Sequence, residues 1–370
     1  MNTKHFAAFL VFSLVALPLE AVKKAATVKP DDTQPVAAAA TSAPRKVSAQ
    51  SFLLNRAALD ALQSDDAEHA NAKATLLKDA QKATSLTLDN IRLPQGATQL
   101  LKPFVKVRAL DMLCVQADQL PLLPCPQKLE RLSCLWSPFR GLKHLEAYPN
   151  ITILKLQGQL LQSNDYTVPN QEKRFATLLN LKKLHTLHYE NALTLILQLP
   201  EHRQFLKTFI QNNPHLRHFY FAGRLTADML KVLRPLPLHT LYLQHTTIND
   251  ASLPFLPLQQ LEVLRLLHND NLHTLTALQN APVRVLDLSH NTHLDASLPS
   301  VVVIMPRLEE LFLDQCDLVD THVEPLLSLA SQLKRLNLVG NARVSQGLRQ
   351  QLSKAFGEKV HFNQPQAHKE

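Results

Sequence analysis

The chain has 370 residues, with 39 Lys and Arg against 31 Asp and Glu, which gives a formal net charge of +8 at pH 7. Four cysteines are too few for a disulfide framework in a chain of this length. The seven glycines form no P-loop or nucleotide-binding turn, and no Gly-x-Ser-x-Gly or His-Glu-x-x-His motif occurs. We therefore expect no enzyme, no cofactor and no metal site, and the basic residues are too scattered to predict nucleic-acid binding.

The first segment, residues 1–21, has the pattern of a signal peptide. A basic start at Lys4 precedes an apolar run over 6–17, which is too short to span a bilayer comfortably, and Pro18 ends that run. Cleavage is expected near Ala21, although the site is not a clean Ala-x-Ala. The alternative is an uncleaved anchor, and only in that case is a membrane expected as a partner.

Two further segments precede the repeats. Residues 22–50 are rich in Ala, Pro, Lys and Thr, with too few large apolar residues to fold, so we expect a disordered tether. Residues 51–82 carry apolar residues at spacings of three to four, which predicts a helical N-terminal cap over the first repeat. These apolar residues are Phe52, Leu53, Leu54, Leu59, Leu62, Leu76 and Leu77.

Residues 83–344 are built from a repeated motif, Leu-x-x-Leu-x-Leu, that closes on Asn or Cys. The four clearest copies are Leu261, Leu264, Leu266 and Asn269; Val283, Leu286, Leu288 and Asn291; Leu308, Leu311, Leu313 and Cys316; and Leu333, Leu336, Leu338 and Asn341. Weaker copies end at Leu88, Met112, Cys134, Leu156, Tyr189, Phe221 and Leu243. The steps between the eleven copies are 24, 22, 22, 33, 32, 22, 23, 22, 25 and 25 residues. Eight of these ten steps fall in the range of 20–29 residues that is typical of one repeat type.

The motif and its step resemble those of the leucine-rich-repeat family. The resemblance implies an α/β fold, a solenoid with a curved parallel sheet on its concave face and turns, 3₁₀ pieces and short helices on its convex face. It also implies that the closing Asn269, Asn291 and Asn341 bond to the backbone where the chain leaves each strand. Cys316 in the same position and Cys134 in a leucine position are then buried thiols, while the pairing of Cys114 with Cys125 stays open.

Between the strands, the sequence predicts different structures in different repeats. Prolines at 235, 237, 254, 257, 282 and 299 favour short turns and 3₁₀ helices over long helices. The two longest repeats differ, because helical spacing predicts a real helix over 200–210, whereas 160–177 reads as an excursion loop. At the far end, residues 345–362 predict a C-terminal cap with a helix over 346–356 and a last edge strand over 360–362. Residues 363–370 are expected to be a loose tail.

Outward residues of the strands predict a surface for a protein partner. The residue between the two core leucines faces outward, because side chains alternate along a strand. In the middle of the resulting column, the residues are His188, Tyr220, Tyr242 and Arg265, and Phe312 follows two repeats later. Tyr and Arg are enriched at binding hot spots. The alternative is that these aromatic side chains only stack across strands.

A second column contains three histidines. His245, His268 and His290 occupy the same position in three consecutive repeats, just after each strand, so we expect them about 5 Å apart. We expect ordinary residues at the rim of the sheet. The alternatives are a ladder sensitive to protonation near pH 6 and, least favoured, a metal site, for which the sequence assures neither oriented partners nor a closed set of ligands.

The sequence therefore predicts a non-enzymatic protein-binding module that acts through the concave face. The signal pattern, the absence of cysteine-rich caps and the single glycosylation sequon at Asn150 favour a protein exported by a bacterium over an animal ectodomain. The expected location is periplasmic or secreted. Two other hypotheses remain, an effector delivered into a host cell and a structural protein of the cell envelope.

Overall fold

The computed structural model describes residues 51–64, 66, 70–93, 98–115, 120–135, 145–157, 177–190, 200–223, 225–294 and 297–362. The chain divides into two units, 1–48 and 49–370, and every described residue lies in the second. The expected signal segment, the tether and the tail over 363–370 lie outside the described residues, as does the excursion loop apart from Thr177.

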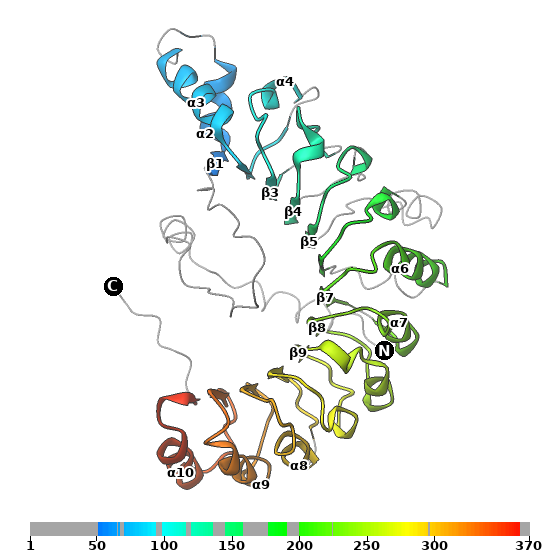
Figure 1. The fold of residues 1–370 in the computed structure, drawn as a ribbon. Coiled ribbons are helices and arrows are strands. Elements are labelled where there is room, and N and C mark those ends of the chain that lie inside the picture. Colours follow the sequence, from blue (N-terminus) through cyan, green and yellow to red (C-terminus); the bar gives the residue numbers. More distant parts are fainter. Residues whose placement is uncertain are drawn as a thin grey trace, which may run out of the picture. The chain divides into compact units, whose positions relative to one another are not determined.

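In the described part of the chain, thirteen strands form one parallel sheet in which each strand pairs with the next along the sequence. The eleven predicted repeat strands are all present as β2 to β12, and the predicted last edge strand is β13. The bounds are β1 Ser51–Leu54, β2 Ser85–Asp89, β3 Ala109–Leu113, β4 Arg131–Leu135, β5 Ile153–Gln157, β6 Thr186–Glu190, β7 His218–Ala222, β8 Thr240–Gln244, β9 Val263–Leu267, β10 Val285–Asp287, β11 Glu310–Phe312, β12 Arg335–Asn337 and β13 Val360–His361. Figure 1 shows the strands along the inner side of the curved unit and the helices along its outer side. The predicted leucine-rich-repeat solenoid is confirmed.

The start of the segment over 51–82 differs from the prediction. The sequence predicted helix from residue 51, but Ser51–Leu54 is strand β1, which pairs with β2. Phe52 and Leu54 are buried while Ser51 and Leu53 are exposed, which is the period of two that a strand requires. The adjacent Leu53 obscured that alternation in the sequence. Helices α2 Arg56–Gln63 and α3 Ala70–Lys82 follow, and the Asn55 side chain caps α2 by accepting a hydrogen bond from Ala58 N.

Leucines at equivalent positions form the core. Leu264, Leu286, Leu311 and Leu336 pair in register across β9 to β12, and each is completely buried. A single repeat has no second layer to cover these side chains, so each repeat is stabilised by its neighbours in the stack. Burying a leucine contributes roughly 1.5–3 kcal/mol, and this gain recurs in every repeat.

Buried asparagine side chains bond to the backbone where the chain leaves the sheet, as predicted. The Asn291 amide donates to Leu266 O and Leu288 O at 2.6 Å each, and its Oδ1 accepts from Asn269 N at 2.7 Å. Asn341 repeats this arrangement, since its Nδ2 donates to two backbone carbonyls and its Oδ1 accepts from Cys316 N and Leu318 N. Each amide thus joins its own repeat to the preceding one. This satisfies backbone groups that would otherwise be buried without partners.

The cysteines lie where the repeat pattern predicts. Cys316 is buried, with its Sγ 3.2 Å from Leu288 O, and burial raises the pKa of its thiol to about 12. Cys134 is also buried, and burial raises the pKa of its thiol well above the usual range. Cys114 is exposed and Cys125 half-buried, and both are free thiols in the structure. The two core thiols are therefore structural side chains.

Helices and short turns cover the outer side. The predicted convex helix is α6 Pro200–Asn212, and the predicted C-terminal helix is α10 Gln346–Phe356, where Ser345 Oγ accepts from Leu348 N. The other helices are α4 Thr98–Leu101, α7 Ala227–Leu233, α8 Ser297–Val302 and α9 Asp320–Val323. The 3₁₀ helices are Pro126–Lys128, Leu145–Ala147, Thr177–Asn180, Asp250–Phe255, Leu258–Gln260, Thr276–Leu278, Glu324–Leu329 and Gly357–Lys359. Pro299 differs from the prediction of a turn, because it lies in the first turn of α8, where proline is tolerated.

The leucine core gives a stability prediction. Replacing Leu264 by Ala leaves a cavity beneath β9, because neighbouring repeats hold the backbone in place. We expect the free energy of unfolding to fall by about 2–5 kcal/mol, measured by urea denaturation. The exposed Leu53→Ala serves as the matched control, because Leu53 is half-exposed and its change removes little buried surface. Equal losses in the two variants would contradict the core assignment.

Candidate binding surface

The predicted outward residues form one continuous column on the sheet, which we call the sheet-face column. Strand pairing places its members in direct register, one per strand. The column is Asp111, Ser133, Lys155, His188, Tyr220, Tyr242, Arg265, Asp287, Phe312 and Asn337. Because a parallel sheet repeats about every 4.8 Å, neighbouring members are close enough to interact.

Aromatic rings occupy the centre of the sheet-face column. The rings of His188 and Tyr220 are stacked with centroids 5.3 Å apart, and those of Tyr220 and Tyr242 are tilted at 6.0 Å. Tyr242 Oη donates to Gln244 Oε1 at 2.7 Å, and partial burial raises the pKa of Tyr242. His188 Nε2 lies 3.6 Å from Glu190 Oε2. The rings therefore form a half-buried platform with polar groups at its edge.

Arg265 lies next to this platform. Its Nη1 is 3.8 Å from Asp287 Oδ2, and the Arg265 side chain is 43% exposed while that of Asp287 is only 9% exposed. The carboxylate of Asp287 also accepts a hydrogen bond from Ser289 N at 3.1 Å. A largely buried carboxylate thus holds an accessible guanidinium at the surface of the sheet.

Phe312 is less accessible than the sequence suggested. The register placed it outward, and it does face outward, but it is only half-buried rather than exposed. The guanidinium carbon of Arg335 lies 5.0 Å from the Phe312 ring centroid, and that of Arg265 lies 6.0 Å from it. Cations over an aromatic face are attracted to it. Phe312 therefore serves as a support for two arginines.

The three histidines after the strands form a stacked ladder, which we call the histidine ladder. The rings of His245 and His268 are stacked with centroids 4.4 Å apart, and those of His268 and His290 at 4.1 Å. All three have left-handed backbones, with φ of 51°, 51° and 63°. Asn90, Cys114, Gln315 and Gly340 have positive φ at the same position of other repeats. His and Asn adopt this conformation more readily than most residues, which gives the ladder a backbone reason.

Burial and the neighbouring imidazoles lower the pKa of two members of the histidine ladder, His245 and His268. Burial, followed by the neighbouring His290 and His245, lowers the pKa of His268 to about 4, while Asp270 acts in the opposite direction. Burial also lowers the pKa of His245. Among the described residues, no group of three or more His, Cys, Asp or Glu could hold a metal ion. Face-to-face imidazoles direct their nitrogen lone pairs alongside one another rather than toward a common ion.

A pH dependence of stability follows from the lowered pKa of His268. In the unfolded chain the pKa is near 6.5, so the unfolded state binds more protons at mildly acid pH. The ladder's contribution is therefore present above pH 6.5 and is lost as the pH falls from 6.5 to about 4. We expect His268→Asn, which suits the left-handed backbone, to lose less stability over this range than the wild type. Urea denaturation at pH 7.5, 5.5 and 4.0 measures the difference, and parallel pH profiles would contradict it.

Sequence reasoning missed a third column, which we call the strand-start column. Its members precede the strands, and the backbone N–H of each donates to the carbonyl of the previous member at 2.7–3.0 Å. The column is Thr84, Arg108, Glu130, Thr152, His185, Arg217, His239, Glu262, Arg284, Glu309 and Lys334. The signal was present in the sequence, because each member directly follows the first apolar residue of its motif.

The known proteins that resemble this chain are solved structures. No protein-family model and no curated protein matches the chain. The chain is similar to an internalin (InlF) from Listeria monocytogenes at a TM-score of 0.43 and 15% identity, over 78% of this chain and 89% of that one. It is similar to the ectodomain of the receptor kinase GASSHO1 from Arabidopsis thaliana at a TM-score of 0.39 and 14% identity, over 78% of this chain and 36% of that one.

None of the helices in the described ranges is long and apolar enough to cross a membrane. The fold follows from the repeat structure of this chain. Each copy of the motif forms one strand, the strands stack in parallel and in sequence order, and the closing asparagines bond to the backbone of adjacent repeats. These features give the chain the fold of a leucine-rich-repeat solenoid.

Proposed function

We propose that this protein is a non-enzymatic protein-binding module that acts through the stretch of its sheet-face column from His188 to Phe312. The observation that carries the proposal is the placement of Tyr220, Tyr242 and Arg265 on three successive strands. Tyr and Arg combine a large contact area with a polar group, and they are enriched where binding energy is concentrated. His188 and Phe312 flank them, at the two ends of the same stretch of sheet.

The arrangement supports binding better than it supports packing alone. Aromatic residues do stack across strands, and stacking contributes to the stability of any sheet. However, the Arg265 guanidinium is held by Asp287 in an accessible position, where it contributes little to the core. A rigid platform of this kind loses little side-chain freedom when a partner binds. The partner therefore meets rings and a cation that are already in place.

A double substitution tests the proposal. Replacing Tyr220 and Tyr242 by Ala removes most of the aromatic platform, while both side chains are only half-buried. We expect partner binding to weaken at least about 30-fold, since hot-spot residues contribute about 2 kcal/mol or more each. A partner isolated with the wild-type protein is titrated against each variant by calorimetry.

The matched control for this test is Thr87→Ala with Asp111→Ala. These residues lie in register with each other on β2 and β3, far from the platform. Asp111 belongs to the sheet-face column but lies outside the stretch from His188 to Phe312. The control should bind normally, and all variants should keep the wild-type circular dichroism spectrum. Unchanged affinity in the tyrosine double variant would refute the proposal.

We also propose that the protein is exported, as a periplasmic or secreted protein of a bacterium. The support is the basic start and short apolar run within residues 1–21. Measuring the intact mass and the compartment of the protein in its own cells tests this. We expect the loss of about the first 21 residues and a product outside the cytoplasm. A full-length soluble protein in the cytoplasm would contradict export and would favour an effector, whereas a full-length membrane-bound protein would favour an anchored envelope protein.

A further inference from the structure

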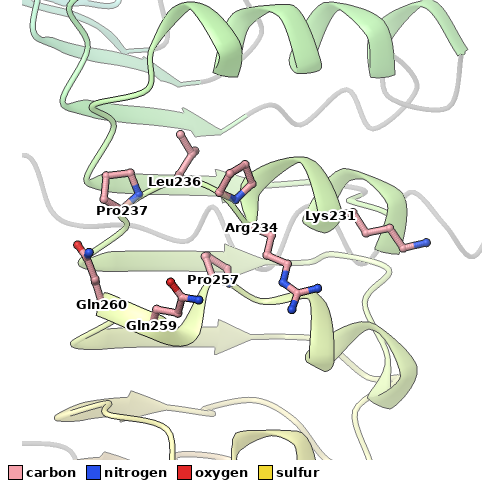
Figure 2. Close-up of a pocket in the computed structure, with 8 residues that line it drawn as sticks. Lys231, Arg234, Leu236, Pro237, Pro257, Gln259 and Gln260 are labelled. Atoms are coloured by element: carbon pink, nitrogen blue, oxygen red, sulfur yellow. The ribbon is translucent and has the colours of Figure 1, made fainter.

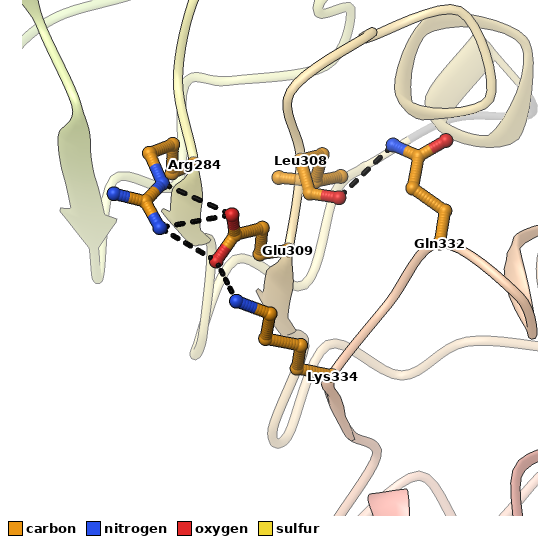
Figure 3. A network of polar contacts seen from close by, with 5 residues as sticks. All are labelled: Arg284, Leu308, Glu309, Gln332 and Lys334. Atoms are coloured by element: carbon orange, nitrogen blue, oxygen red, sulfur yellow. Dashed lines mark hydrogen bonds and ion pairs between the residues drawn. The ribbon is translucent and has the colours of Figure 1, made fainter.

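The strand-start column changes its charge pattern in the middle of the sheet. Toward the C-terminal end, Glu309 accepts bonds from Arg284 at 2.9 Å and lies 2.8 Å from Lys334 Nζ (Figure 3). Toward the N-terminal end, Arg108 pairs with Glu130 at 3.2 Å. The members between Glu130 and Glu262 include no acidic residue at all.

The middle members, His185, Arg217 and His239, are the basic stretch. Arg217 Nη1 lies 3.4 Å from His239 Nε2, and His239 Nδ1 lies 3.1 Å from Pro237 O. Since a carbonyl oxygen only accepts, His239 Nδ1 is the donor to Pro237 O. Among the described residues, neither Arg217 nor His239 forms an ion pair with a carboxylate. The side-chain partner of Arg217 is thus an imidazole and not a carboxylate.

The positive region affects the pKa of a neighbouring histidine. Burial, followed by His239, Arg217 and His185, lowers the pKa of His218. Lys183 adds a further exposed cation, and its Nζ bonds to the neutral Asn150 Oδ1 at 2.6 Å. In the paired parts of the column, a carboxylate balances such charges. Here no described carboxylate forms an ion pair with Arg217 or Lys183.

A pocket of about 400 Å³ continues this region around the edge of the sheet. Figure 2 shows Lys231 and Arg234 on one side of it, Pro237 at the approach to β8, and Pro257 and Gln260 from the next repeat. Pro237 joins the pocket to the column, because its carbonyl is the acceptor for His239. Lys231 is partly neutralised by Asp228 at 3.0 Å, whereas Arg234 is exposed at the end of α7.

We propose that the strand-start edge of β6 to β8 binds an acidic segment of the protein partner, with a carboxylate of that segment at Arg234. This rests on the proposed function, since β6 to β8 also carry His188, Tyr220 and Tyr242. Arginine binds carboxylates through two parallel hydrogen bonds. The stretch from His185 to His239 covers two strand spacings, about 10 Å, which matches roughly three residues of an extended peptide. A nucleic acid would need a longer basic stripe.

A labelled octaglutamate peptide tests the proposal with the full-length chain. Fluorescence anisotropy measures its affinity for the wild type and for Arg217→Gln with Arg234→Gln. We expect binding to weaken about tenfold or more in this variant, because each lost contact is a hydrogen bond to a charged group. Arg217→Lys with Arg234→Lys keeps the charges and should retain most of the affinity. This conservative pair also guards against a loss that comes from misfolding.

The matched control is Arg307→Gln with Lys354→Gln, which removes the same charge from exposed positions elsewhere. Equal weakening in the control would overturn the proposal, because attraction to the net charge would then explain binding. Binding of a DNA duplex or heparin that depends on Arg217 and Arg234, without such dependence for octaglutamate, would also overturn it. The Tyr220→Ala and Tyr242→Ala variant should still bind octaglutamate, so failure here is distinct from failure of the sheet-face proposal.

Discussion

In every repeat, the backbone N–H and C=O groups need hydrogen-bond partners where the chain leaves the sheet, and the structure depends on meeting this need. A strand of three to five residues ends inside the stack, where water does not reach its carbonyls and amides. The buried amides of Asn269, Asn291 and Asn341 meet this need, because each both donates to carbonyls and accepts from an N–H. Cys316 occupies the same position with fewer bonds, and there Asn341 supplies the acceptor for its N–H. Stacked leucines supply most of the buried apolar surface. The asparagine amides provide the hydrogen bonds for the backbone as it turns away from the strand.

A fixed turn in each repeat has a consequence for the surface. Since every repeat places equivalent residues in register, any outward position becomes a column that runs along the sheet. The core leaves these positions free to vary, so their chemistry reflects other constraints. The sheet-face column is aromatic and cationic in its middle, and the strand-start column is ion-paired at its ends and basic between them. The two distinctive stretches share β6 to β8.

The histidine ladder shows how a backbone constraint produces an electrostatic property. The left-handed conformation after each strand favours residues such as His and Asn. Three histidines in succession then stack at 4.1–4.4 Å. Burial and the neighbouring rings lower the pKa of His268, the middle one. The lowered pKa of His268 is thus a consequence of the repeat itself. Its effect on stability is separate from the binding surfaces.

The sequence by itself determined the repeat, the eleven strands, the buried closing amides and the outward column, because strand alternation and a constant step fix which face each residue takes. It did not determine that Ser51–Leu54 is a strand, because only pairing with β2 distinguishes it from the first turn of a helix. Nor did it show that arginines from two other repeats cover Phe312, or that Pro237, which accepts a hydrogen bond from His239, lines a pocket together with Arg234. Those contacts join residues from different repeats and different layers. Local patterns encode the direction of a side chain, whereas its neighbours across the stack are decided only when the repeats pack.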